Sequence, residues 1–133
     1  MSLALRGMRI MPPENLDELA PWFVPYCLEA FDFLASEFGF ELLGKTLAYE
    51  TVVLYTRGDV TIEIGCELGC LPDVFVNNLY VKDEWADDSF QTKWLSLQRR
   101  APYDTGDPEY HRIVREILAG FREIVRAHDC LWR

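Results

Sequence analysis

The sequence predicts a single α+β domain built of two layers, in which an antiparallel β-meander of three to four strands packs against an N-terminal and a C-terminal helix. Apolar residues recur at helical spacing near both ends of the chain, whereas in the middle they alternate with polar residues, as in half-buried strands. The chain has 133 residues, half of them hydrophobic, which suits one domain with one core. We therefore treat residues 1–133 as a single α+β domain, with residues 1–13 as a loose N-terminal arm.

The first long helix is expected to begin near Pro21 or Pro25, because proline is tolerated only in the first turn of a helix. It should end at Phe38, since Gly39 suits the left-handed residue that terminates many helices. At 100° per residue one face is apolar, which predicts a stripe that contacts the core. That stripe comprises Val24, Cys27, Leu28, Phe31, Leu34, Ala35 and Phe38.

Strand character follows this helix. The turn residues at 57–59 separate two alternating segments and predict a β-hairpin. Two glycines and a proline at 65–73 predict a bulge or loop. We expect strands at 40–43, 46–56, 60–64 and 74–81.

The last part of the chain should be helical. Residues 82–88 are charged and predict a loop, and a short helix is expected to begin near Asp88 or Ser89. Asp107-Pro108-Glu109 places a cap, a proline and an acid where helices begin, so the last helix should span residues 108–127. The agreement of the two periodicities predicts a common core. Its expected members, in or next to it, are Val53, Tyr55, Val60, Ile62, Ile64, Ile117, Phe121 and Ile124.

The negative charge of the chain is concentrated in its middle. The formal net charge is −9, and residues 14–88 carry 16 acids against three bases. Such a surface repels phosphate backbones and attracts basic proteins, so we expect no nucleic-acid partner. No stretch approaches the roughly 20 apolar residues that span a bilayer, so we expect no membrane partner either. The alternative is that the charge only keeps the protein soluble.

The sequence contains no recognisable catalytic or cofactor motif. Neither a dinucleotide-binding nor a Walker pattern is present, so no cofactor and no catalytic residue are predicted. Cys66 and Cys70, with His128 and Cys130, could form the two halves of a zinc site, but their spacing is unconventional. In the absence of a secretion signal all four cysteines are expected to be free thiols, without bound metal.

Three aromatic residues lie outside the apolar stripe of the first helix and share a side of it. They are Trp22, Tyr26 and Phe33, with Glu29 beside them. Exposed rings of this kind anchor protein interfaces, and a nearby acid favours a basic partner, so these four residues form the predicted protein-binding site. Two alternatives are that residues 82–100 cover the rings, and that the rings form a symmetric dimer interface.

One pattern resembles a known type of protein. Phe38-Gly39-Phe40-Glu41-Leu42, Val53-Leu54-Tyr55 and Val60-Thr61-Ile62-Glu63-Ile64 are similar to a helix–strand–hairpin arrangement in small bacterial α+β proteins of unknown function. Some of these are immunity proteins, which neutralise toxins encoded beside them. The resemblance covers about residues 28–81 and supplies no functional residues. It implies a bacterial cytoplasmic protein and a binding role.

Three hypotheses about function follow. The first is a non-enzymatic protein-binding module, immunity-like, with a basic partner. The second is a homo-oligomeric structural domain. The third is a small enzyme whose site is assembled from separate residues such as Cys66, Asp73 and His111.

Overall fold

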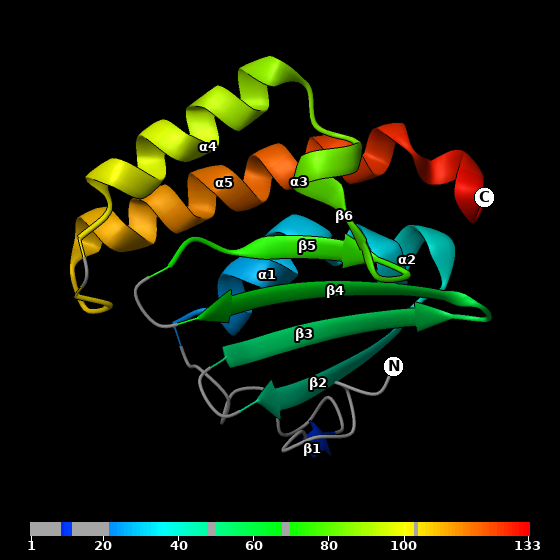
Figure 1. Ribbon diagram of the computed structural model, residues 1–133. Helices are drawn as coiled ribbons and strands as arrows, with labels where there is room; N and C mark the ends of the chain where they lie inside the picture. The colour runs from blue at the N-terminus through cyan, green and yellow to red at the C-terminus, as the bar shows by residue number, and fades with distance from the viewer. Residues whose placement is uncertain (1–8, 12–21, 48–49, 68–69, 103) are drawn as a thin grey trace.

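The computed structural model describes residues 9–11, 22–47, 50–67, 70–102 and 104–133. Within these residues six antiparallel strands form one sheet whose order follows the chain (Figure 1). The fold is thus the predicted α+β meander, with more strands than the expected three to four. The strands are β1 (Arg9–Met11), β2 (Glu41–Leu47), β3 (Glu50–Arg57), β4 (Val60–Glu67), β5 (Asp73–Val76) and β6 (Leu79–Tyr80).

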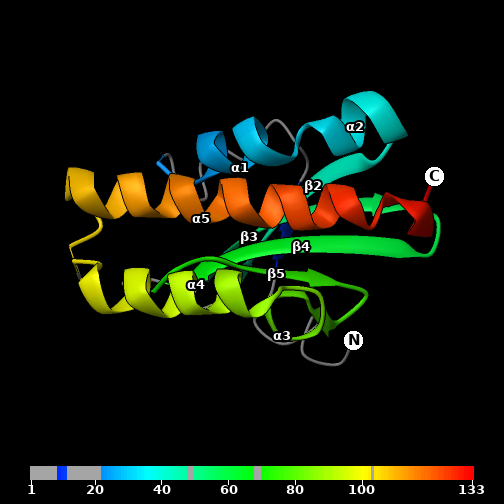
Figure 2. The ribbon, with the colours of Figure 1, turned by 90° about the horizontal axis from the view of Figure 1, so that it is seen from above.

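The helices gather over one face and one edge of this sheet. They are α1 (Val24–Phe31), α2 (Phe33–Phe38), α3 (Val81–Glu84), α4 (Asp88–Arg100) and α5 (Pro108–Ala127), followed by a 3₁₀ turn at Asp129–Leu131. Seen from above, α1 and α2 lie along one side of α5 and α4 lies along the other (Figure 2). The long helix α5 therefore has two flanks, each of which meets a different part of the chain.

The core lies between the sheet and α5. Six of the eight residues predicted for it are fully buried, and the other two, Val60 and Ile124, are partly buried against them. The helix start at Asp107 is also as predicted, because its side chain accepts a hydrogen bond from the Glu109 N–H at 2.8 Å. Of the expected N-terminal arm the structure describes residues 9–11, which pair with β2.

The first helix is divided at Asp32, and one residue next to the division is unexpectedly buried. Phe31 and Phe33 are 0% and 7% exposed, although residues two apart on a continuous helix point about 200° from each other. Phe33 is thus buried although it lies outside the apolar stripe predicted for this helix. Gly39 ends α2 in the left-handed conformation, with φ of 73°, as predicted.

The strand expected at 74–81 is two strands joined by a tight turn. Asn77 and Asn78 both have positive φ, 49° and 69°, which is the conformation of a type I′ hairpin turn. Asn77 is also held by β4, because its side-chain oxygen accepts a hydrogen bond from the Thr61 N–H at 2.8 Å. The chain therefore reverses there and continues into α3, where a charged loop was expected.

Candidate functional site

The aromatic residues of the predicted binding site lie against α5 of the same chain. Phe33 is buried, and Trp22 and Tyr26 are partly buried. The Trp22 ring lies 5.5 Å from the Tyr110 ring and 5.1 Å from the His111 ring, centroid to centroid. One alternative was that residues 82–100 cover these rings; the structure places α5 over them instead. We call this surface the α5 seam: Trp22, Tyr26, Glu29, Phe33 and Glu37 with His111, Arg115 and Arg126.

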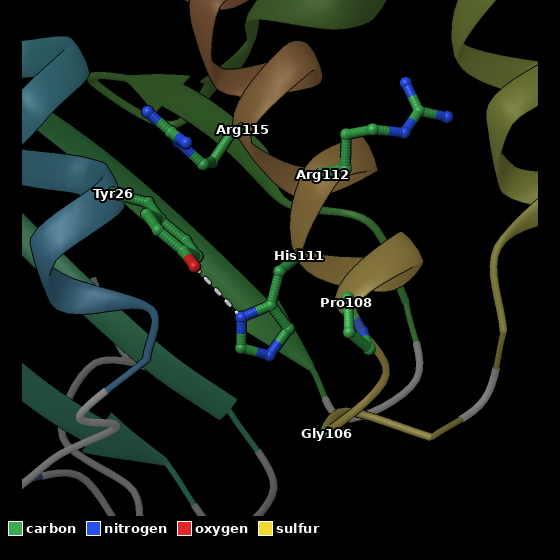
Figure 3. A pocket seen from close by; sticks show the side chains of 6 residues that line it. All are labelled: Tyr26, Gly106, Pro108, His111, Arg112 and Arg115. Carbon is green, nitrogen blue, oxygen red and sulfur yellow. Dashed lines mark hydrogen bonds between the residues drawn. The ribbon is translucent and has the colours of Figure 1, made fainter.

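Hydrogen bonds fix His111 in one tautomer within the seam. Its Nε2 lies 2.5 Å from the carbonyl oxygen of Thr105, which can only accept, so Nε2 carries the hydrogen. In that tautomer Nδ1 accepts from the Tyr26 hydroxyl at 3.0 Å (Figure 3). Both ring nitrogens are occupied, so His111 links α1 to the start of α5 as a half-buried structural histidine.

A surface pocket of about 390 Å³ opens beside this pair. Tyr26 and His111 both line it and point toward each other, whereas Arg112 points away (Figure 3). A second hollow of about 240 Å³ lies on the other side of Tyr26. Arg115, which lines both, places its Nη2 2.8 Å and 3.0 Å from the two carboxylate oxygens of Glu29. The charge of Arg115 is thus already balanced.

An arginine of α5 covers the Phe33 ring, farther along the seam. The guanidinium carbon of Arg126 lies 4.1 Å from the centre of the Phe33 ring. The Nη2 of Arg126 donates to a Glu37 carboxylate oxygen at 2.8 Å, and this hydrogen bond lowers the pKa of Glu37. The aromatic ring and the nearby acid are therefore both satisfied by one arginine of α5.

The other flank of α5 carries a groove that the sequence analysis did not identify. It has a volume of about 410 Å³ and lies between α4, the α3–α4 link and the end of α5. We call it the Trp85 groove. Its lining residues are Trp85, Asp87, Ser89, Phe90, Lys93, Glu123, Ile124, Ala127 and His128.

A stack of two rings forms one wall of the Trp85 groove. The rings of Trp85 and His128 lie 4.1 Å apart, centre to centre, and are nearly parallel, at 5°. The Nδ1 of His128 donates to the carbonyl oxygen of Ile124 at 2.8 Å, which orients the imidazole. His128 is half-buried. The stack is thus preformed by contacts within the chain.

The floor of the groove depends on a glycine. The Phe90 ring lies 4.9 Å from the Phe121 ring of the core. A Cβ atom on Gly120 would come within 2.6 Å of Phe90 Cε2, so a larger residue there would displace the ring. Gly120 therefore allows the Phe90 ring of α4 to pack closely against α5.

Acidic residues border this groove. Asp83, Glu84, Asp87 and Asp88 are exposed, and Asp83 pairs with Lys82 at 3.7 Å. Among the residues that the structure describes, the other three make no ion pair. One oxygen of Asp87 accepts from the Phe90 N–H at 2.8 Å, and so begins α4.

The residues considered for an enzyme site do not come together. Cys66 is buried, with its Sγ 3.5 Å from the Tyr110 hydroxyl, and burial raises the pKa of that hydroxyl. Asp73 pairs with Gly65, the neighbour of Cys66, so their side chains point to opposite faces of the sheet. His111 bonds to Tyr26 and Thr105. Each of the three residues thus has its own surroundings.

The two halves of the considered zinc site are also separate. Cys66 contacts Tyr110 in the first turn of α5, whereas His128 follows its last residue. Eighteen residues of helix correspond to about 27 Å, which no shared metal bridges. Across the described ranges, no three His, Cys, Asp or Glu side chains are grouped to hold a metal ion.

Comparison of the chain with family models, curated proteins and solved structures finds no match. In the part of the chain that the structure describes, no helix has the length and apolarity needed to cross a membrane.

Proposed function

We propose that the protein is a non-enzymatic protein-binding module, and that its basic partner docks on the Trp85 groove. The observation that carries this proposal is the groove itself, a hollow lined by aromatic rings at the border of unpaired acids. The proposal keeps the class of function predicted from the sequence but favours a different surface. The α5 seam is less suited, because arginines of the chain already cover Tyr26 and Phe33 and pair with the acids beside them.

The residue types of the groove support a protein partner. Tryptophan is the residue most enriched among those that dominate binding energy, and such residues lie in pockets surrounded by polar groups. Trp85 has this setting, with Asp87, Lys93 and Glu123 at the rim. The stack with His128 limits the motion of Trp85, so little side-chain entropy would be lost on binding.

The charge of the region supports a basic partner. Residues 82–88 contain four acids and one base, and the whole chain carries −9. Complementary charge accelerates encounter and disfavours acidic competitors, an effect that salt weakens. Lys93 belongs to the groove as well, but its Nζ is 3.3 Å from Glu116. The bacterial cytoplasm remains the setting that the resemblance predicts.

Binding of a lysine-rich peptide, compared with a counterpart carrying glutamate in place of lysine, tests this proposal. We expect the basic peptide to bind, to bind more weakly as salt rises, and to shift the NMR resonances of Trp85 and His128. Asp87→Asn should weaken binding, since asparagine keeps the helix cap but removes the charge. Asp107→Asn makes the same change at the start of α5 and should leave binding unaltered. Equal binding of both peptides, or equal effects of both variants, would contradict the proposal.

A further inference from the structure

The chain uses one arrangement twice on the α5 seam. Arg126 stacks on Phe33 and donates to Glu37, and Arg115 lies over Tyr26, 5.4 Å from its centre, and donates to Glu29. In both cases an aromatic ring from one helix and a carboxylate near it hold one guanidinium. The planar group suits this environment because it stacks on rings and donates several hydrogen bonds within its own plane.

The Trp85 groove has the ring and the carboxylate of this arrangement. Trp85 and Phe90 supply aromatic surface, and the Asp87 oxygen that does not cap α4 accepts no hydrogen bond from the described residues. The groove's own cation, Lys93, is exposed and paired with Glu116 instead. On the seam, an arginine of α5 occupies the position between the ring and the carboxylate. In the groove, none of the described arginines occupies the corresponding position.

We propose that the Trp85 groove binds the guanidinium of an arginine side chain presented by the basic partner. This inference rests on the proposed function and specifies its anchoring group. The guanidinium lies against the aromatic lining and donates to the Asp87 carboxylate. An ammonium group satisfies this site less well, because it is more strongly hydrated and cannot stack as a plane.

The size and charge of the groove fit this ligand. A volume of about 410 Å³ accommodates a side chain in a shallow hollow that is largely open to solvent. An aromatic ring attracts a cation even at such an exposed site. Glu84 and Asp88, both exposed and near Asp87 in the chain, add negative potential for approach.

Three synthetic peptides test the inference. They share identical lysine-containing flanks and differ at one central residue, which is arginine, lysine or citrulline, the uncharged isostere of arginine. Titrations are followed by the indole N–H signal of Trp85, assigned with Trp85→Phe. We expect the arginine peptide to bind roughly two- to fivefold more tightly than the lysine peptide. The citrulline peptide should bind more weakly than the arginine peptide, since it lacks the charge.

Matched variants assign the preference to the groove. Asp87→Asn should reduce the arginine-over-lysine ratio, and Asp107→Asn should not. Equal affinity of the arginine and lysine peptides at the groove would overturn the arginine inference but leave the proposed function standing. If no peptide shifts the Trp85 and His128 signals, docking of a basic partner on the groove is itself wrong. Amide spectra that match the unmodified protein confirm that each variant is folded.

Discussion

The two flanks of α5 treat their aromatic residues differently. On the α5 seam, Phe33 and Tyr26 are each covered by an arginine of α5 that also pairs with an acid of α1 or α2. Along the Trp85 groove, Trp85 is stacked on His128, and within the described ranges the acids before α4 have no such arginine. An aromatic residue outside an apolar stripe can thus be covered by a long basic side chain of the same chain.

The largest expected effect that tests this comparison is the loss of Phe33. Phe33→Ala should lower the free energy of unfolding by about 3–5 kcal/mol, the range for a buried phenylalanine. Phe33→Leu retains most of the volume and should cost less than about 1.5 kcal/mol. Urea unfolding measures both. A negligible cost for Phe33→Ala would show that Phe33 is not part of the core.

Trp85→Ala should have a smaller effect on stability. It removes the stack with His128 from a partly exposed site, and aromatic pairs contribute about 0.5–1.5 kcal/mol beyond their buried area. Leu95, which is 49% exposed on α4, provides a control in Leu95→Ala, which should change little. A cost for Trp85→Ala as large as that for Phe33→Ala would remove the distinction between the two flanks.

Arg126→Ala should lower the melting temperature less than Trp85→Ala does, but more than Arg112→Ala does. Arg112 pairs with Glu109 and Glu116, as Arg126 pairs with Glu37, but among the described contacts it covers no ring. The excess effect at Arg126 therefore reports the stacking on Phe33. It should persist at high salt, which screens ion pairs between exposed groups. Equal melting temperatures for the two variants would contradict the covering role of Arg126.

The smallest expected effect is a pH dependence of the free energy of unfolding that comes from Asp73 in β5. Burial raises the pKa of Asp73 from its ordinary value of 3.8, and the hydrogen bond from Tyr80 and the charge of Lys82 offset this only in part. Because the native state holds this proton more tightly, its contribution to stability is present below pH 3.8 and is lost as pH rises through the raised pKa. Asp73→Asn should therefore gain stability relative to the unmodified protein across that interval. Parallel urea curves from pH 3.5 to 7 measure the difference, and a constant offset between the two proteins would refute it.

The fold was predictable because its main elements repeat a simple period. Strand alternation around Tyr55 and Ile62, and the apolar face of α5 around Phe121, indicate one core without further information. The division at Asp32 was not predictable in the same way, because no proline or glycine marks it and the helical pattern continues through it. The turn at Asn77-Asn78 did carry a signal, since asparagine tolerates positive φ, but it lies between residues typical of strands.

The site was harder to predict, because exposure depends on which elements pack together. The rings at Trp22, Tyr26 and Phe33 were predicted to bind another protein. The α5 residues that pack against these rings lie more than 80 residues away in the sequence. The groove had one signal in the sequence, a tryptophan within the acidic run 83–88. Its proximity to His128 is a tertiary contact that no local pattern contains.

The order of the strands has a consequence for synthesis of the protein. Each strand of the sheet pairs with the next along the chain, so the sheet can assemble while the ribosome is still translating α4 and α5. Its apolar face, including Ile62 and Ile64, then waits for α5, which ends 51 residues after β5. At about 5–20 residues per second this interval lasts roughly 3–10 s. During those seconds the nascent chain exposes a surface that chaperones recognise, and its yield in the cell should depend on them.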